Sequence, residues 1–141
     1  YVQFVVPSPG VTFNRFHVSI SVGTGTFGVA IADSACTLVS NTSVTVAAPG
    51  NGFRAFTTPA TVTLAPGTYF FVYTSTVSTD RIFAAGSDWM SNLMNSGLSS
   101  STYKYFQDNV NASVAGGPAT TCNATRTNSV NSPVPFFILS Y

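Results

Sequence analysis

The sequence predicts an all-β protein, an antiparallel β-sandwich that is jelly-roll-like and has one short helix at most. Three observations predict it: apolar and polar residues alternate along several short segments, Pro and Gly recur between them, and a single segment has helical spacing. About seven to nine short strands with turn signals roughly every ten residues are typical of sandwiches and jelly rolls. The whole chain, residues 1–141, fits one β-sandwich domain.

The clearest alternation begins at Phe16. Every second residue up to Val22 is apolar, and the residues between them, including His17, are polar, as in a half-buried strand. After "GTGT" (23–26) the alternation resumes at Phe27. We therefore expect two strands joined as a hairpin.

Pro and Gly punctuate the middle of the chain. Val44 and Val46 predict a short strand, closed by a Pro-Gly-Asn-Gly turn. In "LAPGTYFFVY" (64–73), Pro66 and Gly67 suit the two central positions of a type II turn, where Gly accepts a positive φ. The aromatic run that follows is apolar on both faces, which predicts a central strand buried on both sides.

The second half of the chain is less regular. Residues 82–83 either continue the aromatic strand or begin the next one. Residues 89–94 carry apolar side chains at i, i+4 spacing after a Ser-Asp pair that suits a helix cap. This is the only helix candidate. Residues 102–106 predict a further strand, residues 107–135 form a long polar stretch, and the chain closes with the strand "PFFILSY".

Charge is scarce in this chain. Charged residues make up 6% of it, and five Lys or Arg against four Asp give a net charge of +1. This balance offers no basic footprint for nucleic acid, and the apolar runs are far shorter than the ~20 residues that span a bilayer. We expect a soluble chain with no nucleic-acid partner and no membrane insertion, either processed or part of a longer protein, since it begins with Tyr. The low net charge favours an assembly.

Groups that could perform catalysis are equally few. The acidic residues are Asp33, Asp80, Asp88 and Asp108, which suit turn and helix caps better than a catalytic pair, although Asp80 and Asp88 flank one loop. His17 has no serine in a strand-turn-helix elbow to work with. We predict a non-enzymatic protein with no catalytic residues, no cofactor and no metal.

The two cysteines do not point to a metal site. Cys36 and Cys122 lie far apart and match no metal-ligand spacing. A long-range disulfide and two separate buried thiols are both open, and we favour free thiols.

The candidate ligand-binding residues lie between residues 88 and 105. Trp89, beside Asp88 and Asn92, could stack against a sugar ring while its polar neighbours bond the hydroxyls, and Tyr103 and Tyr105 would extend the surface. The alternative, favoured for large apolar residues in general, is that Trp89 and its apolar neighbours plug the open end of the sandwich.

Two blocks of the sequence, which begin at Asn14 and at Val62, carry a resemblance. They are "NRFHVSISVGTGTFGVAIAD" and, further along, "VTLAPGTYFFVYTST". Both resemble a β-sandwich module found in tail fibres, tailspikes and other appendage proteins of tailed bacteriophages. The chain departs from that module at Ala32, where Tyr is frequent, and the half after Ile82 does not resemble it. The resemblance implies a non-enzymatic virion module, commonly trimeric, that builds a fibre or presents loops to a host surface glycan.

The functional expectation combines this resemblance with the scarcity of charge and of catalytic groups. We expect a structural or adhesion module on the virion surface: a tail fibre, tailspike, capsid decoration or head fibre protein. Its expected partners are sister subunits, with a trimer favoured, other virion proteins, and a host surface glycan. The alternative is a carbohydrate-binding module of a secreted bacterial protein, with Trp89 and Tyr103 as its platform.

Overall fold

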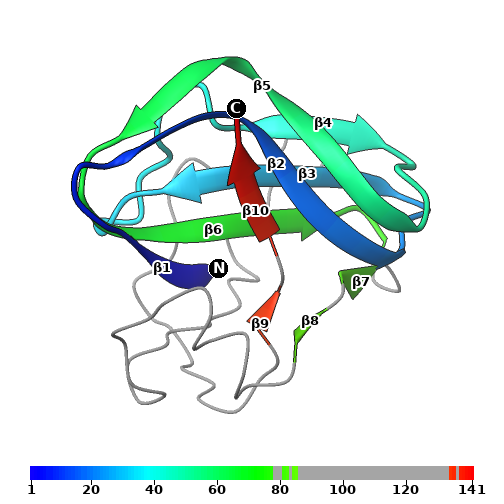
Figure 1. Ribbon diagram of the computed structural model, residues 1–141. Coiled ribbons are helices and arrows are strands. Elements are labelled where there is room, and N and C mark those ends of the chain that lie inside the picture. Colours follow the sequence, from blue (N-terminus) through cyan, green and yellow to red (C-terminus); the bar gives the residue numbers. More distant parts are fainter. Residues whose placement is uncertain (78–80, 83, 86–133, 136) are drawn as a thin grey trace.

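Strands account for the regular structure of this protein in its computed structural model, which describes residues 1–77, 81–82, 84–85, 134–135 and 137–141. Two antiparallel sheets enclose an apolar core, so the predicted β-sandwich is confirmed (Figure 1). The described residues contain no helix, and hence none that is long and apolar enough to cross a membrane.

The two sheets are named here after a central strand of each. The β6 sheet has the strand order β1-β6-β3-β4, and the β2 sheet has the order β10-β2-β5, with β7 also paired to β2. A separate two-stranded ladder joins β8 to β9. The bounds are β1 (Val2–Val6), β2 (Val11–Val22), β3 (Thr26–Ala32), β4 (Val44–Ala47), β5 (Gly52–Leu64), β6 (Gly67–Ser75), β7 (Arg81–Ile82), β8 (Ala84–Ala85), β9 (Val134–Pro135) and β10 (Phe137–Ser140).

The first six strands pair as one rolled hairpin. β3 pairs with β4, β2 pairs with β5, and β1 pairs with β6, so each pair encloses the one before it. The chain changes sheets between β1 and β2, between β2 and β3, between β4 and β5, and between β5 and β6. Nested antiparallel pairing of this kind across two sheets is the jelly-roll arrangement.

Two turn predictions are wrong. β2 and β3 form no hairpin, because residues 23–25 carry the chain from the β2 sheet to the β6 sheet. Gly67 does not have the positive φ of a type II turn, and a Cβ there would meet only the Tyr69 side chain, at 3.6 Å. Gly10 is one glycine that the backbone does require, because its φ is 113° and an added Cβ would lie 2.5 Å from the Leu64 carbonyl oxygen.

A bulge between β2 and β5 decides which of their residues face the core. The register of the two strands shifts between Phe13 and Arg15, and the ladder skips the β5 residues around Pro59, which has no N–H to donate. The Thr58 hydroxyl lies 2.9 Å from the Asn14 carbonyl oxygen and ties the bulge together. As a result, Phe13 and the next core residue along β2 both point inward although three positions separate them.

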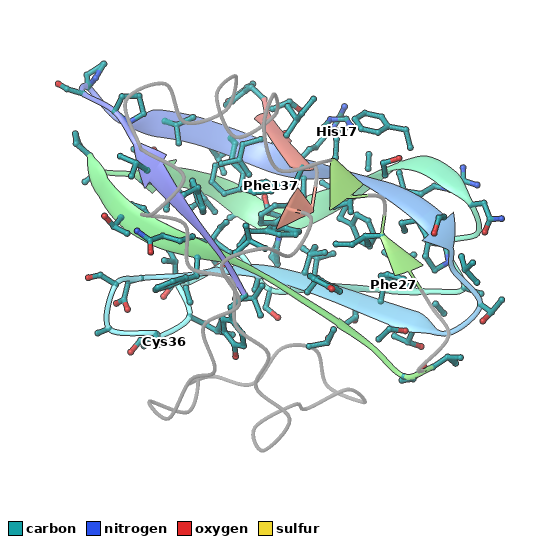
Figure 2. The ribbon with its side chains drawn as sticks, turned by 90° about the horizontal axis from the view of Figure 1, so that it is seen from below. His17, Phe27, Cys36 and Phe137 are labelled. Atoms are coloured by element: carbon teal, nitrogen blue, oxygen red, sulfur yellow. The ribbon has the colours of Figure 1, made fainter. Side chains whose placement is uncertain are left out.

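The core between the sheets is rich in phenylalanine. Phe71 of β6 stacks on Phe137 of β10 with ring centroids 4.2 Å apart and an interplanar angle of 9°. The rings of Phe4 and Phe137 are nearly perpendicular, with centroids 5.3 Å apart and an interplanar angle of 74°. Phe137 lies between the sheets in Figure 2, so the last strand is anchored in the core, and the predicted C-terminal strand is confirmed.

The β6 sheet is also buried on its outer face, which we call the covered face. A second apolar cluster lies on this face. Within the described residues, Cys36 belongs to the cluster, and Tyr1 and Leu38 pack against it. The prediction that the aromatic strand after Pro66 is central and buried on both sides is therefore confirmed. The cluster members on β3 and β6, each at most 3% exposed, are Ala30, Ala32, Phe70 and Val72.

The connection between β3 and β4, residues 33–43, carries part of this cover. Asp33 Oδ1 accepts a hydrogen bond from the Thr37 N–H at 2.9 Å, so the prediction that this carboxylate caps a turn is confirmed. The Thr42 hydroxyl is fully buried and accepts a hydrogen bond from the Ile31 N–H at 3.1 Å. These bonds hold the connection against the end of β3.

Cys36 is disulfide-bonded, so the preference for free thiols is wrong for this residue. It lies in the covering connection and is 3% exposed. Cys122, the other cysteine of the chain, lies outside the described residues.

Candidate functional site

The ligand-binding residues predicted from the sequence all lie outside the described residues. The same is true of the predicted helix at 89–94 and the predicted strand at 102–106. Both interpretations of the tryptophan, as a sugar-stacking surface and as a plug, therefore stay predictions. The residues concerned are Asp88, Trp89, Asn92, Tyr103 and Tyr105.

The described residues offer a different candidate on the outer face of the β2 sheet, which we call the open face. Phe53 and Ile138 on this face are 52% and 40% exposed, and Tyr141, 77% exposed, follows directly after β10. The strand registers place eight outward-facing residues there: Arg15, His17 and Ser19 on β2, Phe53, Ala55 and Thr57 on β5, and Ile138 and Ser140 on β10.

The alternation of each strand produces this face. In β2 the apolar residues point inward, so the residues between them, including His17, point outward. In β5 the two phenylalanines are three positions apart and must face opposite sides. Phe56 is 1% exposed, so Phe53 is the outward one. This three-residue spacing is the signal in the sequence that marks Phe53 as an outward-facing residue.

His17 lies at the centre of the open face. Its cross-strand neighbours are Ala55 on β5 and Ile138 on β10. Its ring stacks on Phe53, with centroids 5.4 Å apart and an interplanar angle of 15°. Its Nε2 lies 2.7 Å from the Ser140 hydroxyl oxygen. Partners on two neighbouring strands therefore fix the imidazole, which Figure 2 shows on the side of the sandwich away from Cys36.

The charge on the open face comes from Arg15. This side chain is exposed and pairs in register with Ser140 of β10. Arg54, on the neighbouring strand, donates from its guanidinium to the Asn51 carbonyl oxygen at 2.6 Å. Asp33, the one acidic side chain in the described part of the chain, belongs to the connection that follows β3 in the other sheet. Among the described residues the open face thus carries positive charge and no acidic side chain.

The hydrogen bond between His17 and Ser140 raises the question of nucleophilic catalysis. A histidine can activate a serine hydroxyl, but the reaction also needs a group that orients the imidazole and donors that stabilise an oxyanion. The other described neighbours of His17 are Phe53, Ala55 and Ile138, whose side chains can neither orient the imidazole by a hydrogen bond nor donate one to an oxyanion. Within the same residues no group of three His, Cys, Asp or Glu side chains could hold a metal. The described residues of the open face thus offer an exposed aromatic ring, hydroxyl groups and one guanidinium, which can bind a ligand by stacking, hydrogen bonding and charge.

Comparisons of the chain with protein-family models, with curated proteins and with solved structures found no match. The fold places the chain in the class of antiparallel β-sandwiches with jelly-roll pairing. One of its outer faces is covered and the other is open. The functional argument therefore rests on the residues of this chain.

Proposed function

We propose that this chain is a non-enzymatic structural and adhesion module of a bacteriophage virion, as in a tail fibre, tailspike, capsid decoration or head fibre protein. The observation that carries the proposal is the place of the resembling span in the fold. Residues 14–74, which resemble phage appendage modules, make up β3, β4, β5 and most of β2 and β6. The resemblance thus coincides with a structural unit, the nested strands of the sandwich, rather than with scattered segments.

Assembly into a homo-oligomer, with a trimer favoured, is the second part of the proposal. Within the described residues the β6 sheet ends in the edge strands β1 and β4, whose outer edges sister subunits can cover. Val5 on the edge strand β1 is a large apolar residue that is 37% exposed. Only 6% of the residues are charged, so little electrostatic repulsion opposes association.

A position on the outside of the particle is the third part. Disulfides form and persist in oxidising surroundings, and Cys36 is disulfide-bonded. This supports a module that works outside the cell, where it contacts other virion proteins and a host surface glycan.

Sedimentation of the purified chain and immunolabelling of assembled particles test this proposal. We expect a compact trimer in solution and labelling on intact virions. Val5→Asp should weaken the trimer, because it places a charge on an edge strand that a sister subunit covers. A chain that sediments as a monomer at all concentrations and labels no particle contradicts the proposal.

A carbohydrate-binding module of a secreted bacterial protein is the second candidate. The disulfide favours it, because secreted proteins keep disulfides that cytoplasmic proteins lose, and so does the exposed aromatic ring of Phe53. Two measurements distinguish the candidates: the oligomeric state of the chain, and the effect of Trp89→Ala on glycan binding. A trimer in which Trp89→Ala leaves glycan binding unchanged argues against the predicted carbohydrate platform, and a monomer that loses glycan binding with Trp89→Ala argues against the virion module.

A further inference from the structure

The open face holds an aromatic ring that is exposed and yet fixed in position. Phe53 is 52% exposed, and its ring lies against the imidazole of His17. His17 is fixed in turn by Ser140 on the strand at its other side. A ring held before its ligand arrives loses little side-chain entropy on binding. Its negatively polarised face attracts C–H groups, such as those on the flat side of a sugar ring.

Hydroxyl groups surround this ring on the same face. Ser19 lies directly opposite Phe53 in the ladder between β2 and β5. Ser140 and Thr57 lie on either side of Arg15, on β10 and β5. Each hydroxyl can donate one hydrogen bond and accept others, which suits a ligand that carries several hydroxyls itself.

The charge of the face selects among such ligands. Arg15 lies two residues from His17 on the same side of β2, about 7 Å along the strand. Its guanidinium presents parallel N–H groups that match a carboxylate. No acidic side chain of the described residues lies on this face to neutralise it. A ligand with a hydroxyl-rich ring next to an acid group complements all three features.

We propose that the open face binds an acidic saccharide, one whose sugar ring carries a carboxylate. The sugar ring stacks on Phe53, Arg15 pairs with the carboxylate, and Ser19 and Ser140 bond the hydroxyls. This inference rests on the adhesion part of the proposed function, for which it names the ligand class and the residues, and it does not need the trimer.

A panel of immobilised uronate- and sialate-containing oligosaccharides tests the ligand class. Each acid is paired with its methyl ester, which removes the charge and keeps the ring. We expect the full chain to bind at least one acidic oligosaccharide and to bind the matching ester about tenfold more weakly. Retention of no acidic oligosaccharide, or equal retention of acid and ester, overturns the proposal.

Variants of exposed residues then test the place of binding. We expect Phe53→Ala to weaken binding about tenfold, Phe53→Tyr to preserve it, and Arg15→Ala to weaken it about three- to tenfold. Arg54→Ala is the matched control: it removes the same charge from the edge strand, where the guanidinium bonds a backbone carbonyl, and should leave binding unchanged. Thermal unfolding of each variant shows that it is folded.

Three results contradict the assignment to the open face. The first is unchanged binding in Phe53→Ala, and the second is an equal loss in Arg54→Ala and Arg15→Ala, which would indicate net charge alone. The third is a loss in Trp89→Ala without one in Phe53→Ala, which would place the ligand elsewhere. Sedimentation of the same samples keeps the two proposals apart, because a trimer that binds no acidic saccharide loses only this inference.

Discussion

The two outer faces of the sandwich are both made by antiparallel strands, and their side chains differ in kind. On the covered face, β3 and β6 point alanine, phenylalanine and valine outward, and each of these residues is at most 3% exposed. On the open face, β2, β5 and β10 point arginine, histidine, serine and threonine outward, together with the exposed Phe53 and Ile138. One face is therefore a second core, and the other is a surface.

Side-chain size explains how the covered face is sealed. Ala30 and Ala32 leave room above β3, and the connection after that strand returns over it with Cys36 and Leu38. On the open face, the outward positions of the central strand β2 include the long side chains of Arg15 and His17. Small residues on the outward side of a strand thus mark a close neighbour, whereas long polar ones mark solvent or a ligand.

The largest expected effect compares two alanines, one on each face. Ala30→Asp places a charge on a strand position that is fully buried, and it should lower the free energy of unfolding by more than about 4 kcal/mol or prevent folding. Ala55→Asp makes the same change on the open face and should cost less than about 0.5 kcal/mol. Urea denaturation measures both, and far-UV circular dichroism detects a variant that does not fold. Similar stabilities of the two variants would end the distinction between the faces.

The next largest expected effect on stability compares two phenylalanines, one on each face. Phe70 is 3% exposed on the covered face, and Phe70→Ala should cost about 3–5 kcal/mol, because the removed ring leaves a cavity. Phe53→Ala removes the same ring from the open face, where water takes its place, and should cost less than about 1 kcal/mol. Denaturation of the two variants side by side checks this. A loss in Phe53→Ala as large as that in Phe70→Ala would mean that the open face is covered after all.

Much of this contrast could be predicted from the sequence. The run from Tyr69 to Tyr73 is apolar at every position, which predicted a strand buried on both faces, and β6 is one. The polar side of β2, with His17, was equally clear from its alternation. Both patterns are local, because one strand's own residues decide which of its faces meet water.

The missed features depend on contacts between distant residues. Alternation cannot tell a hairpin from a crossover between sheets, and so β2 and β3 were assigned to the wrong pairing. The bulge at Asn14 and Pro59 arises only when β2 and β5 come together, and it sets which residues of both strands face outward. The strand β1 likewise has no local signal strong enough to predict it. The same is true of the side-chain hydrogen bond between His17 and Ser140, which lie 123 positions apart.

Reduction of the Cys36 disulfide, on the covered face, should change the free energy of unfolding by an intermediate amount. Reduction should lower the free energy of unfolding by about 2–4 kcal/mol, because the reduced unfolded chain is less constrained. Thermal unfolding with and without reductant measures this, and peptide mapping without reduction should recover Cys36 joined to Cys122, the one other cysteine of the sequence. Cys36→Ser is the control and should not respond to reductant, whereas Phe53→Ala should respond as the unmodified chain does. Equal unfolding of the oxidised and reduced chain would contradict a structural role.

The smallest effect compares two hydroxyl groups that each make a hydrogen bond. Thr42→Val keeps the shape of a fully buried side chain but leaves the Ile31 N–H without the oxygen that now lies 3.1 Å from it, at a cost of about 1–3 kcal/mol. Ser140→Ala breaks the 2.7 Å contact with His17 on a half-buried surface, where water can replace it, and should cost about 0.5 kcal/mol or less. The difference in urea midpoints between the two variants measures how dry each face is. If Ser140→Ala costs as much as Thr42→Val, the imidazole of His17 is shielded from water, and the open face is then as closed to a saccharide as the covered one.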